Sequence, residues 1–386
     1  MSILKNTTSK VMLAGVTSAF LVAAGFFVSG IGFAWSVIPF ALALICREKL
    51  VRSALIAPYF AGIALIAGWG LVAMGHPALL VMAGAAVLIG MLTALLIYGG
   101  VAIGFLVLAF VPYFPGHPLL AVGAVAPNGG LMALAALLVS VALIEKLSHI
   151  RHRAAAVGVL AVGLGIWNVA AHLQGEAVLV AASGQTSNSA PSWTEVPLSL
   201  PLDISDRLRM EALRAEMEPN GIYVTGENIL RSSDQLALEG WCRFAHEQQV
   251  AVFLGVEDNV TGRSGVALIK PDHDCATMPL VYAAWIGIPE ITGNWFPFKP
   301  IDFVQDDYAQ GIEWLACFEG FSLAAWVKLG LSQPQSVIIV SNDYWTEPLP
   351  VSALRRKISA NFERLFGVVV YHADTGRNLL KQSEAL

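Results

Sequence analysis

The chain has 386 residues, of which 56% are hydrophobic and 13% are charged, and its formal net charge is −5. Water-soluble globular proteins average about 25% charged residues, so this composition excludes an ordinary water-soluble protein along the whole chain. The deficit is concentrated, because the residues from Ser53 to Ile144 include no Asp, Glu, Lys or Arg. A bilayer-spanning helix needs about 20 apolar residues, so this stretch predicts several such helices.

Residues 1–172 are predicted to form a polytopic α-helical membrane bundle of about seven helices. Gly and Pro residues separate the apolar runs. The predicted spans are 11–28, 31–46, 53–74, 78–97, 98–113, 129–145 and 154–172.

Basic residues of this half gather at the N-terminus, in the loop 47–52 and in the loop 146–153. Short loops rich in Lys and Arg stay on the cytoplasmic side of a membrane. An even number of predicted spans separates each basic segment from the next, so all three share one side. We therefore expect a multi-pass protein of the bacterial inner membrane, with everything after His172 in the periplasm.

From about residue 177, strands alternate with helices, which predicts a separate α/β domain over 177–386. Residues 173–386 hold 15 basic and 26 acidic residues, and an acidic domain excludes direct nucleic-acid binding. No Cys/His cluster has the spacing of a zinc site, and neither a metal nor a cofactor is expected. Cys242 and Cys275 are predicted to be structural, and whether they form a disulfide stays open.

Three polar clusters follow predicted strands of this domain: Glu227, then Cys317 with Glu319, then Asn342 with Asp343. Sites of α/β proteins gather at the carboxyl ends of strands. A cysteine thiolate there is a nucleophile, and a nearby carboxylate is a general base. We expect Glu227 and Cys317 on adjacent strand ends. The competing interpretation makes Cys317 a small core residue and Glu227 a solvated strand end.

Three segments carry a resemblance to a known family: Thr225-Gly-Glu-Asn228, Cys317-Phe-Glu319 and Ser341-Asn-Asp-Tyr-Trp345. In order and spacing they resemble the nitrilase, or carbon–nitrogen hydrolase, superfamily. With the apolar half in front, the layout is similar to that of apolipoprotein N-acyltransferases. The resemblance implies an αββα sandwich and a Glu-Lys-Cys triad, with Cys317 as nucleophile and Glu227 as base. It also implies supporting roles for Glu319, Asn342 and Asp343, and a lipid or lipoprotein substrate.

The chain departs from this family at the lysine of the triad. The segment from Tyr282 to Pro289 aligns best with the family's lysine motif and has Ala284 at the lysine position. Lys299 is the first candidate substitute and Lys270 the second. The sequence also stops at Leu386, before the final strands and the last span of the acyltransferases, and no Pro precedes Glu227.

This combination is similar to the TraB-type conjugal transfer proteins of rhizobial and agrobacterial plasmids, which implies a role in plasmid conjugation and other transfer proteins as partners. Two hypotheses follow. The first is a membrane enzyme that performs Cys-dependent acyl transfer or amide hydrolysis on a lipid or lipopeptide. The second is a non-catalytic membrane scaffold of the conjugation apparatus with a degenerate nitrilase-like domain. An ion-coupled transporter is a distant third, because ionisable residues are missing from the apolar stretch.

Overall fold

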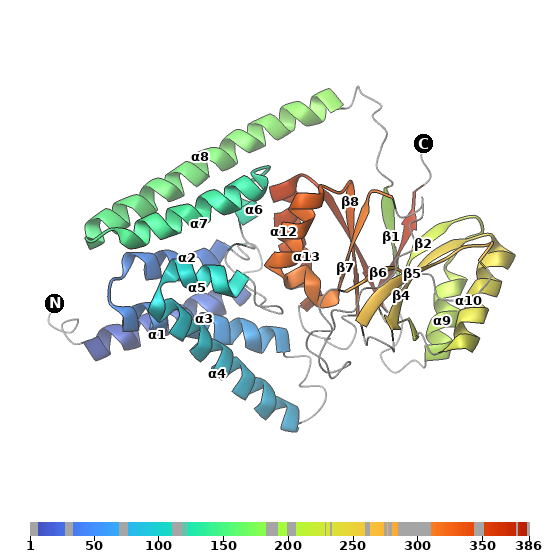
Figure 1. The fold of residues 1–386 in the computed structure, drawn as a ribbon, viewed down its shortest axis with the longest axis horizontal. Helices are drawn as coiled ribbons and strands as arrows, with labels where there is room; N and C mark the ends of the chain where they lie inside the picture. Colours follow the sequence, from blue (N-terminus) through green and yellow to red (C-terminus); the bar gives the residue numbers. More distant parts are fainter. Residues whose placement is uncertain are drawn as a thin grey trace. The chain divides into compact units, whose positions relative to one another are not determined.

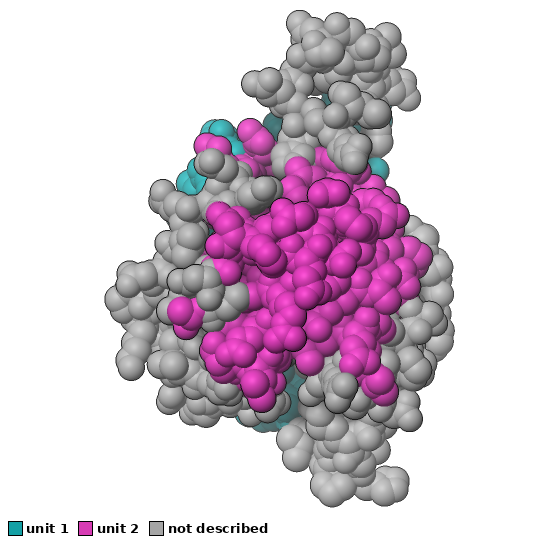
Figure 2. Space-filling model, turned by 90° about the vertical axis from the view of Figure 1, so that its right-hand side faces the viewer, with its two compact units in different colours: residues 1–185, 321–333, 348–367 teal, residues 186–320, 334–347, 368–386 magenta. Residues whose placement is uncertain are grey.

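The structure is a computed structural model, which describes residues 7–27, 34–68, 76–109, 119, 122–182, 192–198, 206–227, 229–231, 234–258, 263–273, 276, 280–284, 310–342, 351–375 and 377–383. The chain forms two compact units, coloured separately in Figure 2. The helical unit comprises residues 1–185, 321–333 and 348–367, and the sheet unit comprises residues 186–320, 334–347 and 368–386. Each unit therefore draws on segments that are far apart in the sequence.

The helical unit forms its helices over the apolar runs of the first half and adds two helices from the second half (Figure 1). The described helices are α1 (Thr7–Phe27), α2 (Ala34–Ile45), α3 (Lys49–Gly68), α4 (His76–Gly99), α5 (Val101–Ala109), α6 (Val122–Val125), α7 (Gly130–Lys146), α8 (Ile150–Ala182), α12 (Leu323–Ser332) and α13 (Val351–Phe366).

The prediction of a polytopic bundle of about seven spanning helices is wrong. Within the described residues, only Ile150–Ala171 of α8 is both long enough and apolar enough to cross a membrane. Helices α2, α5 and α7 have 12, nine and 17 residues, and at about 1.5 Å per residue they fall short of a hydrocarbon core of about 30 Å. The described apolar part of α4, Ala83–Gly99, is equally short. Breaks along the apolar stretch thus leave α2, α5 and α7 too short where spans were predicted.

A buried charged network joins the two basic loops of the helical unit. Glu145, near the end of α7, accepts hydrogen bonds from Arg52 Nη1 at 2.8 Å and from the backbone N–H groups of Val101 and Ala102 at 2.8 and 3.0 Å. These two amides begin α5, so the carboxylate satisfies donors that have no partner within that helix. Arg153 donates to backbone carbonyls at the ends of α2 and α7. The loops 47–52 and 146–153 therefore lie at one end of the unit.

Replacing Glu145 with alanine is expected to lower the free energy of unfolding by about 3 kcal/mol, because it leaves the Arg52 guanidinium, largely buried, without its carboxylate. Glu48→Ala serves as the matched control. Glu48 pairs with Lys10 at the surface, and such a pair contributes about 0 to 1 kcal/mol. Urea unfolding of the purified protein, followed by its helical signal, measures both. Equal losses in the two variants would contradict the network's role.

Helix α6 packs against α13 backbone to backbone. A Cβ atom built on Gly123 would lie 1.6 Å from the carbonyl oxygen of Asn361 in α13. Just beyond α6, the backbone N–H of Asn128 donates to the carbonyl of Arg364 at 2.6 Å. The side-chain amide of Asn168 in α8 donates to a carbonyl of α6 at 2.5 Å. This short turn thus ties α8 of the first half to α13 of the second.

The sheet unit contains one continuous mixed sheet (Figure 1). Its described strands run in the order β6-β5-β4-β2-β10-β9-β8-β7, while β1 pairs with β10 and β3 with β4. The pairs β2–β4, β3–β4, β7–β8 and β8–β9 are parallel and the others antiparallel. The bounds are β1 (Trp193–Pro197), β2 (Ile222–Val224), β3 (Leu230–Arg231), β4 (Ala251–Asp258), β5 (Arg263–Ile269), β6 (Leu280–Ala283), β7 (Ile312–Ala316), β8 (Ser336–Ser341), β9 (Val369–Asp374) and β10 (Asn378–Gln382).

The predicted αββα sandwich of two sheets is wrong, because strand β10 links the two halves into a nearly closed, barrel-like sheet. Strand β10 pairs along β1 and β2 and meets β9 at one pair, Asn378 with Asp374. The two arms on either side of this link enclose an inner core, in which the rings of Phe253 on β4 and Trp314 on β7 lie 4.9 Å apart. Apolar alternation specified the strands, but it did not specify this link.

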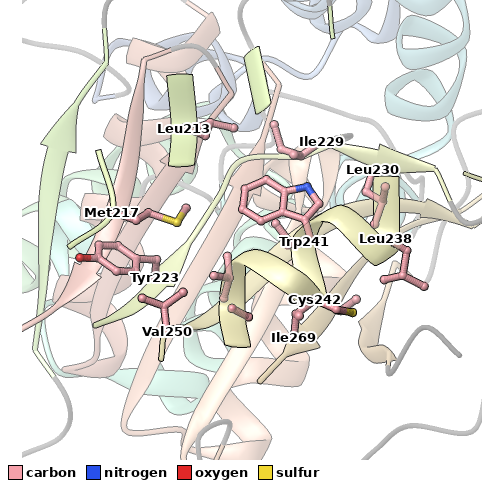
Figure 3. Packing of buried hydrophobic residues seen from close by; sticks show 14 of the residues in the cluster. Leu213, Met217, Tyr223, Ile229, Leu230, Leu238, Trp241, Cys242, Val250 and Ile269 are labelled. Atoms are coloured by element: carbon pink, nitrogen blue, oxygen red, sulfur yellow. The ribbon is translucent and has the colours of Figure 1, made fainter. Parts of the chain in front are cut away.

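Helices α9 (Asp206–Ala215) and α10 (Gln235–Gln248) cover the outer face of the arm that contains β2, β4 and β5 (Figures 1 and 3). Along β4, Phe253 points into the inner core, while Val252 and Leu254 point outward to the helices. This is the period of two that a strand buried on both faces requires. Trp241 of α10 is fully buried in the outer cluster, which fixes α10 against the sheet.

Candidate functional site

The end of strand β8 brings the two predicted catalytic residues together. In the parallel pairing of β7 with β8, Ala316 lies opposite Val340, so Cys317 follows beside Ser341. On the other side, the backbone N–H of Glu227 donates to the carbonyl of Ser341 at 3.1 Å. Neighbouring strands are about 4.8 Å apart, so Glu227 and Cys317 flank the same residue. Both are buried.

Glu227 and Cys317 were expected on adjacent strand ends, and the structure differs in this detail. Glu227 follows β2 and Cys317 follows β7, and these strands are not neighbours in the sheet. The curvature of the sheet brings their ends together, and Ser341 at the end of β8 lies between them.

Close contacts between backbones hold the loop of Glu227. A Cβ atom on Gly226 would lie 2.1 Å from the backbone nitrogen of Thr375, and one on Gly255 would lie 2.0 Å from the carbonyl oxygen of Gly226. The Thr375 hydroxyl donates to the carbonyl of Glu227 at 2.6 Å. Glycine is thus required at both positions, because each lets one backbone approach another. The backbone of the loop that carries the carboxylate is thus held by close contacts and by hydrogen bonds from Thr375 and to Ser341.

Cys317 sits on a sharp elbow. It is the first residue of the 3-10 turn η5 (Cys317–Phe321), it has φ +26°, and its sulfur is not part of a disulfide. A positive φ is strained for a residue with a side chain. Glu319 closes the elbow, because its Oε2 accepts the backbone N–H of Ala316 at 2.9 Å. The same oxygen accepts the hydroxyl of Tyr282 from β6.

The surroundings of the elbow are acidic. Burial first, and then the charge of Glu319 and its hydrogen bond, raise the pKa of Tyr282 well above its ordinary value, and the charges of Glu313 and Glu227 act in the same direction. Tyr282 therefore stays neutral and remains a hydrogen-bond donor across the physiological pH range. The carboxylates of Glu319 and Glu227 thus both contribute to the shift in the pKa of Tyr282.

The position that the resemblance assigns to lysine carries no charge. Ala284 is buried in the inner core, and its backbone N–H donates to the carbonyl of Ser264 at 2.8 Å. Of the candidate substitutes, Lys299 lies outside the described residues. Lys270 follows β5, which runs antiparallel to β4 with Ile269 opposite Val252. Lys270 is therefore at the end of the sheet opposite to Glu227, and the structure does not bring it to the site.

The remaining predicted residues are at or beyond the end of β8. Asn342 follows Ser341 directly and is half-buried, whereas Asp343 lies outside the described residues. Sequence reasoning missed Ser341 as the common neighbour of both catalytic candidates, and it missed Tyr282. The signal for Tyr282 was its place two residues before Ala284, on the same face of the strand.

The described part of the chain contains no group of three or more His, Cys, Asp or Glu residues that could hold a metal ion. No protein-family model matches this sequence, and no curated protein matches it. The chemistry of the site must therefore be argued from its own residues.

Proposed function

We propose that the sheet unit performs Cys-dependent acyl transfer or amide hydrolysis, with Cys317 as the nucleophile and Glu227 as the general base. One observation carries this proposal: a buried cysteine outside any disulfide, on a strained elbow, and a buried carboxylate flank the same residue, Ser341. Covalent catalysis requires a nucleophile and a base that can reach one another, and both residues lie beside the end of β8.

The reaction proceeds in two steps. Glu227 takes the proton of the Cys317 thiol as Sγ attacks the carbonyl carbon of an ester or amide. The bond to the leaving alcohol or amine breaks, that group takes the proton from Glu227, and a thioester remains on Cys317. An amine or water then attacks the thioester and passes its proton to Glu227, which returns it to the departing sulfur. With alanine at position 284, stabilising the oxyanion falls to backbone N–H groups of the elbow.

The proposal places this reaction outside the cytoplasm of a bacterium, on a lipid or lipopeptide at the inner membrane. Helix α8 supplies one segment that could cross the bilayer, and its described apolar side chains are mostly exposed. It starts next to the two basic loops, which favour the cytoplasmic side. Cys242 of the sheet unit is disulfide-bonded, which is typical of proteins outside the cytoplasm.

Plasmid conjugation is the process in which we propose that this activity is used, together with other transfer proteins. A non-catalytic scaffold in the same apparatus is the second candidate. The observation that favours it is the buried alanine at position 284, where the resembling enzymes have lysine.

Iodoacetamide labelling at neutral pH, read by peptide mass mapping, tests the proposal. We expect Cys317 to react about tenfold faster than Cys46, because in the proposed mechanism Glu227 takes the proton of the Cys317 thiol as it attacks. Cys46 is an internal control: it is the other free thiol, and burial raises its pKa. If Cys317 reacts only after the protein is unfolded, it is an inert core residue and the scaffold remains.

A further inference from the structure

The hydrogen bond between Tyr282 and Glu319 connects the two arms of the sheet. Tyr282 lies on β6, at one end of the strand order, and Glu319 follows β7, at the other end. Both side chains are buried, with 7% and 4% of their surfaces exposed. Because Glu319 Oε2 also accepts the Ala316 N–H, the tyrosine hydroxyl is joined through one oxygen atom to the residue that precedes Cys317.

The elbow needs such a connection. Cys317 has φ +26°, and a strained backbone persists only where its surroundings over-determine it. The hydrogen bond from Ala316 to Glu319 closes the turn locally, and the bond from Tyr282 ties the closed turn to the opposite arm. Without the second bond, the turn could relax while the first bond remained intact.

We propose that Tyr282 is a positioning residue for the proposed nucleophile: its hydroxyl, through Glu319, holds the Cys317 elbow in its reactive conformation. This inference rests on the proposed function, and it concerns a residue to which neither the triad nor its supporting residues assign a role.

The ionisation of Tyr282 supports this role. Burial and the carboxylates of Glu319, Glu313 and Glu227 raise its pKa well above the ordinary value, so the hydroxyl keeps its proton while a cysteine thiol titrates. The bond also draws negative charge on Glu319 away from a thiol two residues earlier. Without this hydrogen bond, the carboxylate would disfavour the thiolate more strongly, because like charges oppose ionisation.

Tyr282→Phe removes this hydroxyl, and Tyr223→Phe is the matched control. Tyr223 is also fully buried in the sheet unit, and within the described part of the chain its hydroxyl bonds to the backbone of Glu218, at 2.7 and 3.2 Å. Two measurements on the purified full chain test whether Tyr282 holds the Cys317 elbow. They are hydrogen–deuterium exchange of the backbone amides of 316–320 and the pH profile of iodoacetamide labelling at Cys317.

In Tyr282→Phe we expect exchange of these amides to rise about tenfold and the midpoint of the labelling profile to move upward by about 0.5 to 1 pH unit. Tyr223→Phe should leave both at wild-type values, even if it lowers the melting temperature equally. Exchange that is the same in the two variants would overturn the inference. Faster exchange with an unmoved midpoint would also overturn it, because the bond would then only stabilise the fold.

Glu319→Gln is the second variant, in case Tyr282→Phe does not fold. Glutamine fills the same space and keeps an acceptor for the Ala316 N–H, but it removes the negative charge that accepts the Tyr282 hydroxyl. Hydrogen exchange of the amides of 316–320 should therefore rise, as in Tyr282→Phe. Neither measurement uses a substrate. The positioning role of Tyr282 can therefore be tested separately from the proposed catalytic function. Failure of the wild-type thiol to react faster than Cys46 would overturn the proposed function, while the exchange experiment still judges the connection between Tyr282 and the elbow.

Discussion

Cells that carry Cys317→Ala are expected to transfer plasmid about a thousandfold less often than wild type, because removing a nucleophile eliminates a covalent mechanism. The variant loses only the sulfur of a buried residue, so the fold should persist. Mating frequency is the measurement, with the amount of protein in the membrane fraction determined in parallel. Cys46→Ala is the matched control, since it removes the other free thiol, and it should transfer normally.

Glu227→Gln is expected to cause a loss of the same order, because glutamine cannot relay the proton. Glutamine fills the same space, and the hydrogen bonds between the Glu227 backbone and Ser341 and Thr375 stay in place. Lys270→Ala should have no effect, because Lys270 lies at the other end of the sheet. If Cys317→Ala and Glu227→Gln both transfer plasmid normally while the protein accumulates, catalysis is not its contribution and the scaffold hypothesis stands.

The strands that carry the site could be predicted from the sequence because each is a short apolar run that ends in polar residues. Glu227 and Cys317 were found in this way, and both strand ends are where the alternation predicted them. The sheet they belong to could not be predicted. It depends on β10, a five-residue strand that follows β9, and on its pairing with β1, which lies far away in the sequence.

The apolar first half of the chain shows a different limit. The charge-free run between Ser53 and Ile144 predicted helices, and helices formed. Whether a helix spans a bilayer depends on its uninterrupted length, and Gly99 and Gly100 separate α4 from a nine-residue α5. Composition measures the apolar character of a run, but it does not fix where each helix ends.

Tyr282 illustrates why the site was only partly predictable. Its hydroxyl meets a carboxylate 37 residues later in the chain, across the interior of a sheet whose closure was not foreseen. Strand alternation could place Tyr282 on the inner face, but the partner on that face depended on the curvature. Which residues follow each strand could therefore be predicted from the sequence. Which residues meet across the interior, between the two arms of the sheet, could not.

Gly123→Ala is expected to lower the free energy of unfolding of the chain by about 3 kcal/mol or more, at the upper end of overpacking effects. The new Cβ atom would lie 1.6 Å from the carbonyl oxygen of Asn361 and 3.1 Å from the Cβ of Leu365. The obstacle is the backbone of α13, which cannot rotate away as a flexible side chain can. Helices α6 and α13 would have to separate.

Gly158→Ala is the matched control for this prediction. Gly158 lies in α8, and a Cβ atom built there meets nothing within 4 Å. Since alanine favours a helix over glycine by about 1 kcal/mol, this variant should unfold at an equal or higher denaturant concentration. Both variants add one methyl group to a helix. The difference between them therefore measures the effect of the contact between position 123 and α13, separate from the effect of replacing glycine with alanine.

Urea unfolding and hydrogen exchange of α13 together measure the outcome. Separation of the two helices should break the bond from Asn128 to the carbonyl of Arg364, so amides of 351–366 should exchange faster in Gly123→Ala alone. Unchanged exchange in α13, with stability equal to that of Gly158→Ala, would show that α6 does not pack against α13.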